Sequence, residues 1–220
     1  GDGGRRFAVA VTYKIAAEIG SLGDNTAFLR RQVHDDRILQ ILAAFPRLDV
    51  SILSHTRWAS VGAITEANCH PVDNIAEGGA SDAGAIIHVC LNGDIDNYLD
   101  LKRELEKEGV RIPTDISTDT KLIPLQIARH LAKGEPPAEA FRLAVNDFEG
   151  SHAIAMHTDL APGRIFLAQK GSGQAIFVGI GEGCFYLSSE VYGFVEETSR
   201  YLKLDGESIL PALKGLGFER

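Results

Sequence analysis

The sequence predicts an α+β layered domain, because the types of expected element change twice along the chain. Apolar and β-branched residues run together or alternate near both ends, whereas helical spacing of apolar residues dominates the middle. Strands, then helices, then strands indicate sheets whose faces are covered by helices. No internal repeat or linker divides the chain, so we expect a single domain over residues 1–220.

Composition excludes several classes of partner. The formal net charge is −8 and basic residues never form a run longer than two, which argues against nucleic acid and anionic membrane surfaces. The longest apolar run, 83–91, contains a histidine and is far shorter than the roughly 18 residues of a membrane span. The first residues lack the apolar core of a signal peptide, and three scattered cysteines give no disulfide framework. We therefore expect a cytoplasmic protein with reduced thiols.

The first half of the chain is expected to contain several strands and one helix. Residues 35–45 carry apolar side chains at helical spacing, with Asp35 or Asp36 as the N-cap and Pro46 as the stop. β-rich composition predicts strands at 7–13, 26–33, 50–54 and 83–91.

The second half predicts three helices followed by an antiparallel meander. The helices are expected from Tyr98 through Leu105, over 120–131 with Pro124 in the first turn, and over 138–148. The glycine-rich segment 179–183 joins two strands rather than a strand and a helix, which indicates a hairpin turn instead of a nucleotide site. The strands are expected at 152–158, 164–169, 175–178, 184–187 and 201–204.

Polar residues at two predicted strand ends are candidates for a binding site. Arg57 offers a planar fork suited to a carboxylate and Trp58 a rigid wall. They could equally be an arginine paired with a local acid and a tryptophan filling the core. The loop 59–81 that follows lacks periodicity, and a loop of that length is more often functional than idle.

Asn92 and Gly93 follow an apolar strand, and Asp119 precedes a predicted helix. A side-chain amide and an unhindered backbone N–H pointing the same way are the two donors of an oxyanion hole, although Asn-Gly is also the favoured pair for a tight turn. Asp119 could bind a ligand or simply cap the helix near Thr120.

Four motifs, in this order and with similar spacing, resemble the class II glutamine amidotransferases, as in the glutaminase domain of glucosamine-6-phosphate synthase. A looser likeness continues through residues 148–153 and 204–207, so the resemblance covers roughly 51–207. The motifs are HTRWAS at 55–60, NCHP at 68–71, LNGDIDNY at 91–98 and STDT at 117–120.

The resemblance implies an N-terminal-nucleophile (Ntn) hydrolase, a four-layer α/β/β/α sandwich of two antiparallel sheets that hydrolyses glutamine to glutamate and ammonia. In such enzymes an N-terminal cysteine is the nucleophile and its own α-amino group is the base. The motif match assigns the glutamine α-carboxylate to Arg57 and the α-ammonium to Asp119, with Asn92 and Gly93 as the oxyanion hole. It places Trp58 and Ser60 in the pocket wall, and it implies no cofactor and no metal.

The sequence departs from the family pattern at its start and within the motifs. Residue 1 is glycine, and the family's first strand, first helix and nucleophile have no counterpart, so we expect an N-terminally incomplete domain that is inactive alone. Val61 stands where close relatives have histidine, and Gln174 where they have an apolar pair. Among the cysteines, only Cys69 is expected to be exposed; Cys90 and Cys184 are expected to be packed, with raised pKa.

Two hypotheses follow. In the first, this is a glutamine amidotransferase domain whose nucleophile-bearing segment lies outside the given chain. Ammonia would pass to an acceptor such as a sugar phosphate on an isomerase or synthase domain, and another segment or chain would complete the sheet. In the second, the domain is catalytically inactive and senses glutamine or glutamate, or serves as a scaffold.

Overall fold

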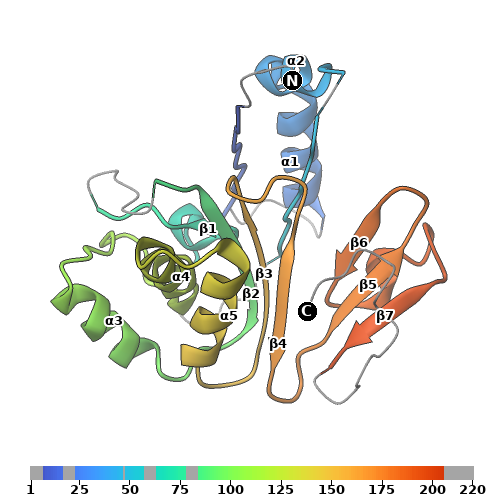
Figure 1. Cartoon of the computed structure of the whole chain (residues 1–220). Coiled ribbons are helices and arrows are strands. Elements are labelled where there is room, and N and C mark those ends of the chain that lie inside the picture. The colour runs from blue at the N-terminus through green and yellow to red at the C-terminus, as the bar shows by residue number, and fades with distance from the viewer. Residues whose placement is uncertain (1–6, 17–22, 47, 57–62, 78–83, 206–220) are drawn as a thin grey trace, which may run out of the picture.

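The structure, a computed structural model, describes residues 7–16, 23–46, 48–56, 63–77 and 84–205. Within these ranges it contains two antiparallel sheets, as the sequence predicted (Figure 1). The first sheet has the strand order β1-β2-β3-β4 and the second has the order β6-β5-β7. The strands are β1 (Val72–Asp73), β2 (Ile87–Gly93), β3 (His152–Thr158), β4 (Phe166–Lys170), β5 (Ile176–Ile180), β6 (Phe185–Ser188) and β7 (Tyr201–Leu204).

Three helices cover one face of the four-stranded sheet: α3 (Tyr98–Lys107), α4 (Leu122–Ala132) and α5 (Pro137–Asp147) (Figure 1). α4 is the central one, since every side chain from Leu122 to Ala128 is buried. Pro124 lies in its first turn, where no helical hydrogen bond is lost. The main core forms where these helices meet alternate residues of β2 and β3, including Ile87, Val89, Leu91, Ile154 and Met156.

The second sheet packs on the opposite side of β3 and β4. Ala153 shares a smaller apolar cluster with Ile176 and Val178 of β5. Every predicted strand from residue 152 onward is present, with bounds within two residues of those expected. The predicted meander is wrong in its connectivity, because the chain changes sheets after β4 and β7 pairs with β5 rather than with β6. The glycine-rich segment 179–183 forms the predicted hairpin turn between β5 and β6.

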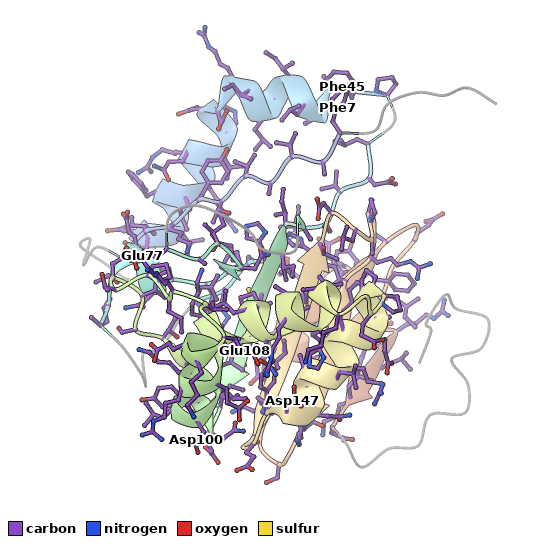
Figure 2. The ribbon with its side chains drawn as sticks, turned by 60° about the vertical axis from the view of Figure 1, so that its left-hand side comes forward. Phe7, Phe45, Glu77, Asp100, Glu108 and Asp147 are labelled. Atoms are coloured by element: carbon purple, nitrogen blue, oxygen red, sulfur yellow. The ribbon has the colours of Figure 1, made fainter. Side chains whose placement is uncertain are left out.

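Residues 7–16 and 48–56, together with helices α1 (Asp24–Asp35) and α2 (Arg37–Ala43), form what we call the N-terminal layer. It projects from one end of the sheets, with Phe7 and Phe45 toward its outer end (Figures 1 and 2). Neither helix has a buried residue. This layer therefore adds little to the core.

Helix α2 confirms the helix predicted at 35–45, and Asp36 is its N-cap. Its carboxylate accepts hydrogen bonds from the backbone N–H groups of Ile38 and Leu39, at 2.9 and 3.0 Å. The Tyr13 hydroxyl also donates to Asp36 at 2.6 Å, which lowers the pKa of Asp36 and raises that of Tyr13. This contact joins segment 7–16 to α2.

Other predictions for the N-terminal layer are wrong. The strand expected at 26–33 is helix α1, because leucine, arginine, glutamine and alanine favour a helix there and outweigh Thr26 and Val33. Segments 7–13 and 50–54 are not strands in the described structure, since neither forms a ladder with another described segment. The short 3-10 helices η1 (Glu66–Asn68) and η2 (Asp119–Lys121) were not expected.

Within the described residues, no helix is long and apolar enough to cross a membrane.

Candidate functional site

The end of β2 presents the Asn-Gly pair predicted as an oxyanion hole. Leu91 points into the helix-covered core, so Asn92 faces the other way and its side chain is exposed. Gly93 has φ +102°. A Cβ at this position would overlap the carbonyl oxygen of Ser151, the residue just before β3. Only glycine fits this close backbone contact, which the Asp94 N–H extends by donating to the Ser151 carbonyl at 3.2 Å.

Asp119 begins η2 and is 5% exposed. One carboxylate oxygen accepts a hydrogen bond from the Ile95 N–H at 3.0 Å, and the other from the Thr120 N–H at 2.8 Å. The hydroxyls of Thr118 and Thr120 lie 3.3 and 3.4 Å from that second oxygen. Among the described residues, no lysine, arginine or histidine forms an ion pair with this carboxylate.

These contacts show which groups of the chain the Asp119 carboxylate binds: the Thr120 N–H at the start of η2 and the Ile95 N–H after β2. Its carboxylate does not cap α4, whose N-cap residue is Lys121. It also binds the backbone two residues after Gly93, so the structure brings Asp119 to the Asn92–Gly93 end of β2 although the two motifs are far apart in the sequence. Four donors and a nearly complete exclusion from water leave a buried anion that a cation would stabilise further.

Asn68 fixes the segment that leads into Asp119. Its side-chain oxygen accepts from the N–H groups of Ser117 and Thr118, at 2.8 and 3.1 Å. Its amide nitrogen donates to the Ala63 carbonyl at 2.9 Å and to the Ser117 hydroxyl at 3.1 Å. Asn68 is 1% exposed, and its side-chain amide is fully hydrogen-bonded. The loop thereby fixes the segment 117–118 that precedes Asp119.

His70 lies between β2 and η2. Its Nε2 is 2.9 Å from the Thr120 hydroxyl, and its Nδ1 accepts from the Leu91 N–H at 3.5 Å. The ring of His55 packs against it with centroids 4.3 Å apart. The NCHP motif did not predict a role for Asn68 or His70 at the site. The one sequence feature that could have indicated it is a pair of polar residues inside a long loop.

Arg57, Trp58, Ser60 and Val61 lie outside the described residues. His55, two positions before Arg57, is described, and its contact with His70 brings that end of segment 48–56 next to the site.

The three cysteines differ in their surroundings. Cys90 lies on β2 two residues before Asn92, and burial raises its pKa to about 12, as expected for a packed thiol. Cys184 is exposed at the β5–β6 hairpin, so the expectation that it packs in a strand is wrong. Cys69 is half-buried, and its thiol donates to the Ile15 carbonyl at 3.5 Å.

A row of titratable side chains crosses the face of the four-stranded sheet that bears Asn92. Asp73, His88 and His157 are cross-strand neighbours on β1, β2 and β3. Burial is the main cause that lowers the pKa of both histidines. For His88, Asp73 opposes this shift and Lys14 and Lys121 add to it; for His157, His88 adds to it. The Lys121 ammonium, itself 1% exposed, is 2.8 Å from Asp73; it holds the pKa of that carboxyl down although burial alone would raise it.

No group of three potential metal ligands occurs among the described residues. Two open cavities, of about 460 and 430 Å³, are lined by neither Asn92, Gly93 nor Asp119.

Residues 79–196 match the family model described as "Glutamine amidotransferase domain". The curated relatives include glutamine–fructose-6-phosphate aminotransferases (isomerizing) from several organisms. That of Methanothermobacter thermautotrophicus is 37% identical over 159 residues, which is 72% of this chain and 25% of the relative. That of Streptomyces coelicolor is 33% identical over 160 residues, 72% of this chain and 24% of the relative. The chain thus spans about a quarter of the length of these relatives.

Two solved structures share the fold. Glutamine phosphoribosylpyrophosphate amidotransferase from B. subtilis, complexed with ADP and GMP, superposes with a TM-score of 0.52 at 20% identity, covering 67% of this chain and 29% of the other. A structure titled as the allosteric regulatory enzyme of purine biosynthesis gives 0.53 at 21% identity, with 67% and 30% coverage. At this identity the likeness concerns the fold alone.

Proposed function

Because the chain belongs to the glutamine amidotransferase family, we propose that it forms the glutamine-binding part of an enzyme that releases ammonia from L-glutamine. The observation that carries this proposal is the bond between Asp119 and the Ile95 N–H. It holds a buried carboxylate beside the Asn92–Gly93 end of β2, so one bound molecule can reach both. Glutamine has both groups that such a site would bind: an α-ammonium for the Asp119 carboxylate and a side-chain amide for Asn92 and Gly93.

In this proposal each site residue has one role. Asp119 receives the α-ammonium through charge-assisted hydrogen bonds, and Arg57 binds the α-carboxylate with its planar fork. Trp58 and Ser60 line the pocket. The Asn92 amide and the Gly93 N–H stabilise the oxyanion of the tetrahedral intermediate when a thiolate attacks the side-chain amide.

The nucleophile belongs to a segment outside the given chain, and the surroundings of the three cysteines support this. A thiol with a pKa of about 12, as at Cys90, holds almost no thiolate at neutral pH. Cys69 donates to a backbone carbonyl, and Cys184 lies on a hairpin of the other sheet. Reading the encoding gene upstream of Gly1 tests this, because a frame without a Met-Cys-Gly start would contradict it.

We further propose that the nucleophile-bearing segment completes the sandwich by pairing with the N-terminal layer. Segments 7–16 and 48–56 form no backbone ladder with any other described segment, and their exposed side chains include Val9, Val11, Val50 and Ile52. Unpaired extended backbone beside alternating apolar residues is a template for an added strand. In that arrangement a fourth, helical layer would cover the second sheet.

The ammonia acceptor is proposed to be a sugar phosphate bound by another domain. The support is the printed name of the curated relatives, glutamine–fructose-6-phosphate aminotransferase, and the three quarters of their length that this chain does not span. An assay of the intact protein for amino-sugar phosphate formed from glutamine and fructose 6-phosphate tests this assignment.

Calorimetric titration of the chain with L-glutamine tests the binding role. We expect binding that Arg57→Ala abolishes, because an unpaired buried carboxylate costs several kcal/mol. Asp119→Asn should weaken glutamine but spare glutaramate, which is glutamine without its α-amino group. In a protein that carries the nucleophile, Asn92→Ala should spare binding and lower turnover by about a hundredfold. Unchanged affinity in Arg57→Ala would contradict the site.

A catalytically inactive sensor of glutamine or glutamate, or a scaffold, is the second candidate. It is favoured by Val61, which removes a polar group that close relatives have beside Ser60. The two candidates differ in one measurement: the intact protein hydrolyses glutamine in the first and only binds it in the second. Absence of both heat and thermal shift with glutamine and glutamate would leave only the scaffold.

A further inference from the structure

One connected set of hydrogen bonds holds the backbone on both sides of Asn92 and Gly93, the last two residues of β2. Before them, the Leu91 N–H donates to His70 Nδ1, and after them the Ile95 N–H donates to Asp119. His70 and Asp119 are themselves joined through the Thr120 hydroxyl, which lies 2.9 Å from His70 Nε2 and 3.4 Å from the Asp119 carboxylate. The three side chains are 8%, 1% and 5% exposed for His70, Thr120 and Asp119, so water competes little for these bonds.

The donors and acceptors in this set fix the protonation of the ring. An N–H faces His70 Nδ1, so that nitrogen must be the acceptor, and the single proton of a neutral imidazole is then on Nε2. Nε2–H donates to the Thr120 oxygen, and the Thr120 O–H is free to donate to Asp119. The opposite tautomer would place two N–H groups face to face at Leu91 and leave Nε2 without a proton to donate.

We propose that His70, as its Nε2–H tautomer, is a positioning residue that acts through Thr120 to orient the Asp119 carboxylate and thereby sets the preference of the site for ligands with an α-ammonium. This inference rests on the role proposed for Asp119. In this proposal His70 acts on the ligand only through Asp119. It fixes the rotation of the carboxylate, so that acceptor directions of Asp119 face the ligand while one oxygen holds the Ile95 N–H.

The test compares matched variants for their preference between glutamine and glutaramate. Thr120→Val removes the hydroxyl at almost constant volume, and we expect the ratio of the two affinities to fall about fivefold or more. Thr120→Ser keeps the hydroxyl and should keep the ratio. His70→Gln retains a donor at the Nε2 position and should lose less than His70→Asn, which cannot reach Thr120. His34→Asn on the exposed end of α1 is the control.

Two further measurements need no ligand. Long-range ¹H–¹⁵N correlation spectra of the histidine rings should show His70 as the Nε2–H tautomer. Hydrogen exchange of the Ile95 amide should be several-fold faster in Thr120→Val than in Thr120→Ser, with β3 amides unchanged.

The outcomes separate this inference from the proposed function. If the unaltered chain binds no glutamine, the proposed function fails, and the tautomer and the Ile95 exchange still decide whether His70 positions Asp119. If it binds glutamine but Thr120→Val keeps the preference over glutaramate, the positioning role is overturned and the binding role stands. An Nδ1–H tautomer, or equal behaviour of Thr120→Ser and Thr120→Val, also overturns the inference.

Discussion

Helices α1 and α4 have similar lengths and opposite environments. α4 buries seven consecutive residues, Leu122 to Ala128, between the four-stranded sheet and its neighbouring helices, whereas α1 buries none. Apolar residues at 38, 41 and 45 are likewise exposed at and just beyond α2. Residues 84–205 therefore form a body with its own core, whereas the apolar side chains of the N-terminal layer have no such core among the described residues. The expected effects of mutation therefore differ sharply between the two regions.

The largest difference is expected between two phenylalanines. Phe148 is fully buried, so Phe148→Ala should lower the free energy of unfolding by about 3–5 kcal/mol. Phe45 is 55% exposed in the N-terminal layer, and Phe45→Ala should cost at most about 1 kcal/mol. Denaturant titrations followed by circular dichroism measure both. Similar losses would show that the layer packs as tightly as the body.

Two glycines with positive φ in the body should differ in the stability that an alanine substitution costs. Gly93→Ala should cost about 3 kcal/mol, because strained φ adds to an overlap with the Ser151 carbonyl. Gly109 has φ +89°, but no atom of the described residues lies within 4 Å of an added Cβ, so Gly109→Ala should cost only about 1 kcal/mol. Denaturant titrations measure both substitutions. Equal losses of unfolding free energy would exclude the close approach of Gly93 to Ser151.

The joint between layer and body should be sensitive to acid. Thr12 contacts His88 at 3.4 Å and Ser51 contacts His157 at 3.0 Å, and burial lowers the pKa of both histidines. A lowered folded-state pKa means that the unfolded chain binds protons first, so stability is full above about pH 6.5 and falls as the pH drops toward the folded-state pKa.

The slope is at most about 1.4 kcal/mol per pH unit for each such histidine. Titrations at pH 7.5 and 5.5 measure it, and His157→Gln should reduce it. An unchanged slope after replacement of both histidines would assign the acid sensitivity elsewhere.

His152 is the weak point of the body. It is fully buried, and neither ring nitrogen has a hydrogen-bond partner in the part of the chain that the structure describes. Phe148 contacts the ring edge-on with centroids 6.1 Å apart. His152→Phe should therefore raise the free energy of unfolding by about 1 kcal/mol at pH 7. Burial, aided by Lys170, also lowers the pKa of His152, so the variant should lose less stability in acid. A destabilised variant would indicate an unseen partner for the ring.

The smallest effect is expected at Ile52, which is 75% exposed on segment 48–56. Ile52→Thr should change the free energy of unfolding by less than about 0.5 kcal/mol, since little apolar area is buried there. If a strand from the intact protein pairs with this segment, the same substitution in the intact protein should cost more. Comparing the two proteins by denaturation measures this directly.

The same two regions differ in how well the sequence predicted them. β3 and β7 have the predicted bounds, and α4 and α5 lie within two residues of theirs, because strong periodicity and local turn residues determine them. Helix α1 was not predicted because the β-propensity of Thr26 and Val33 is weaker than the helix propensity of the residues around them. The pairing of β7 with β5 was missed because register between separated strands has no local signature.

Motif order suggests only part of the candidate site. It suggests Asn92, Gly93 and Asp119, and the structure joins Asp119 to the Ile95 N–H just after β2. The bonds of Asn68 to Ser117 and of His70 to Thr120 join residues about fifty positions apart, which spacing alone does not reveal. Buried polar side chains inside a long loop are the residues for which such distant partners should be sought.

The antiparallel ladder between β2 and β3 has a consequence for how the chain folds. β2 can pair with β3 only after α3, α4 and α5 have been made, because all three helices lie between these two strands in the sequence. Closing such a long loop is entropically costly, whereas helices form from local contacts. During synthesis the three helices can therefore pair first, and the strand that carries Asn92 and Gly93 waits for β3, so the candidate site is among the last parts of the body to assemble.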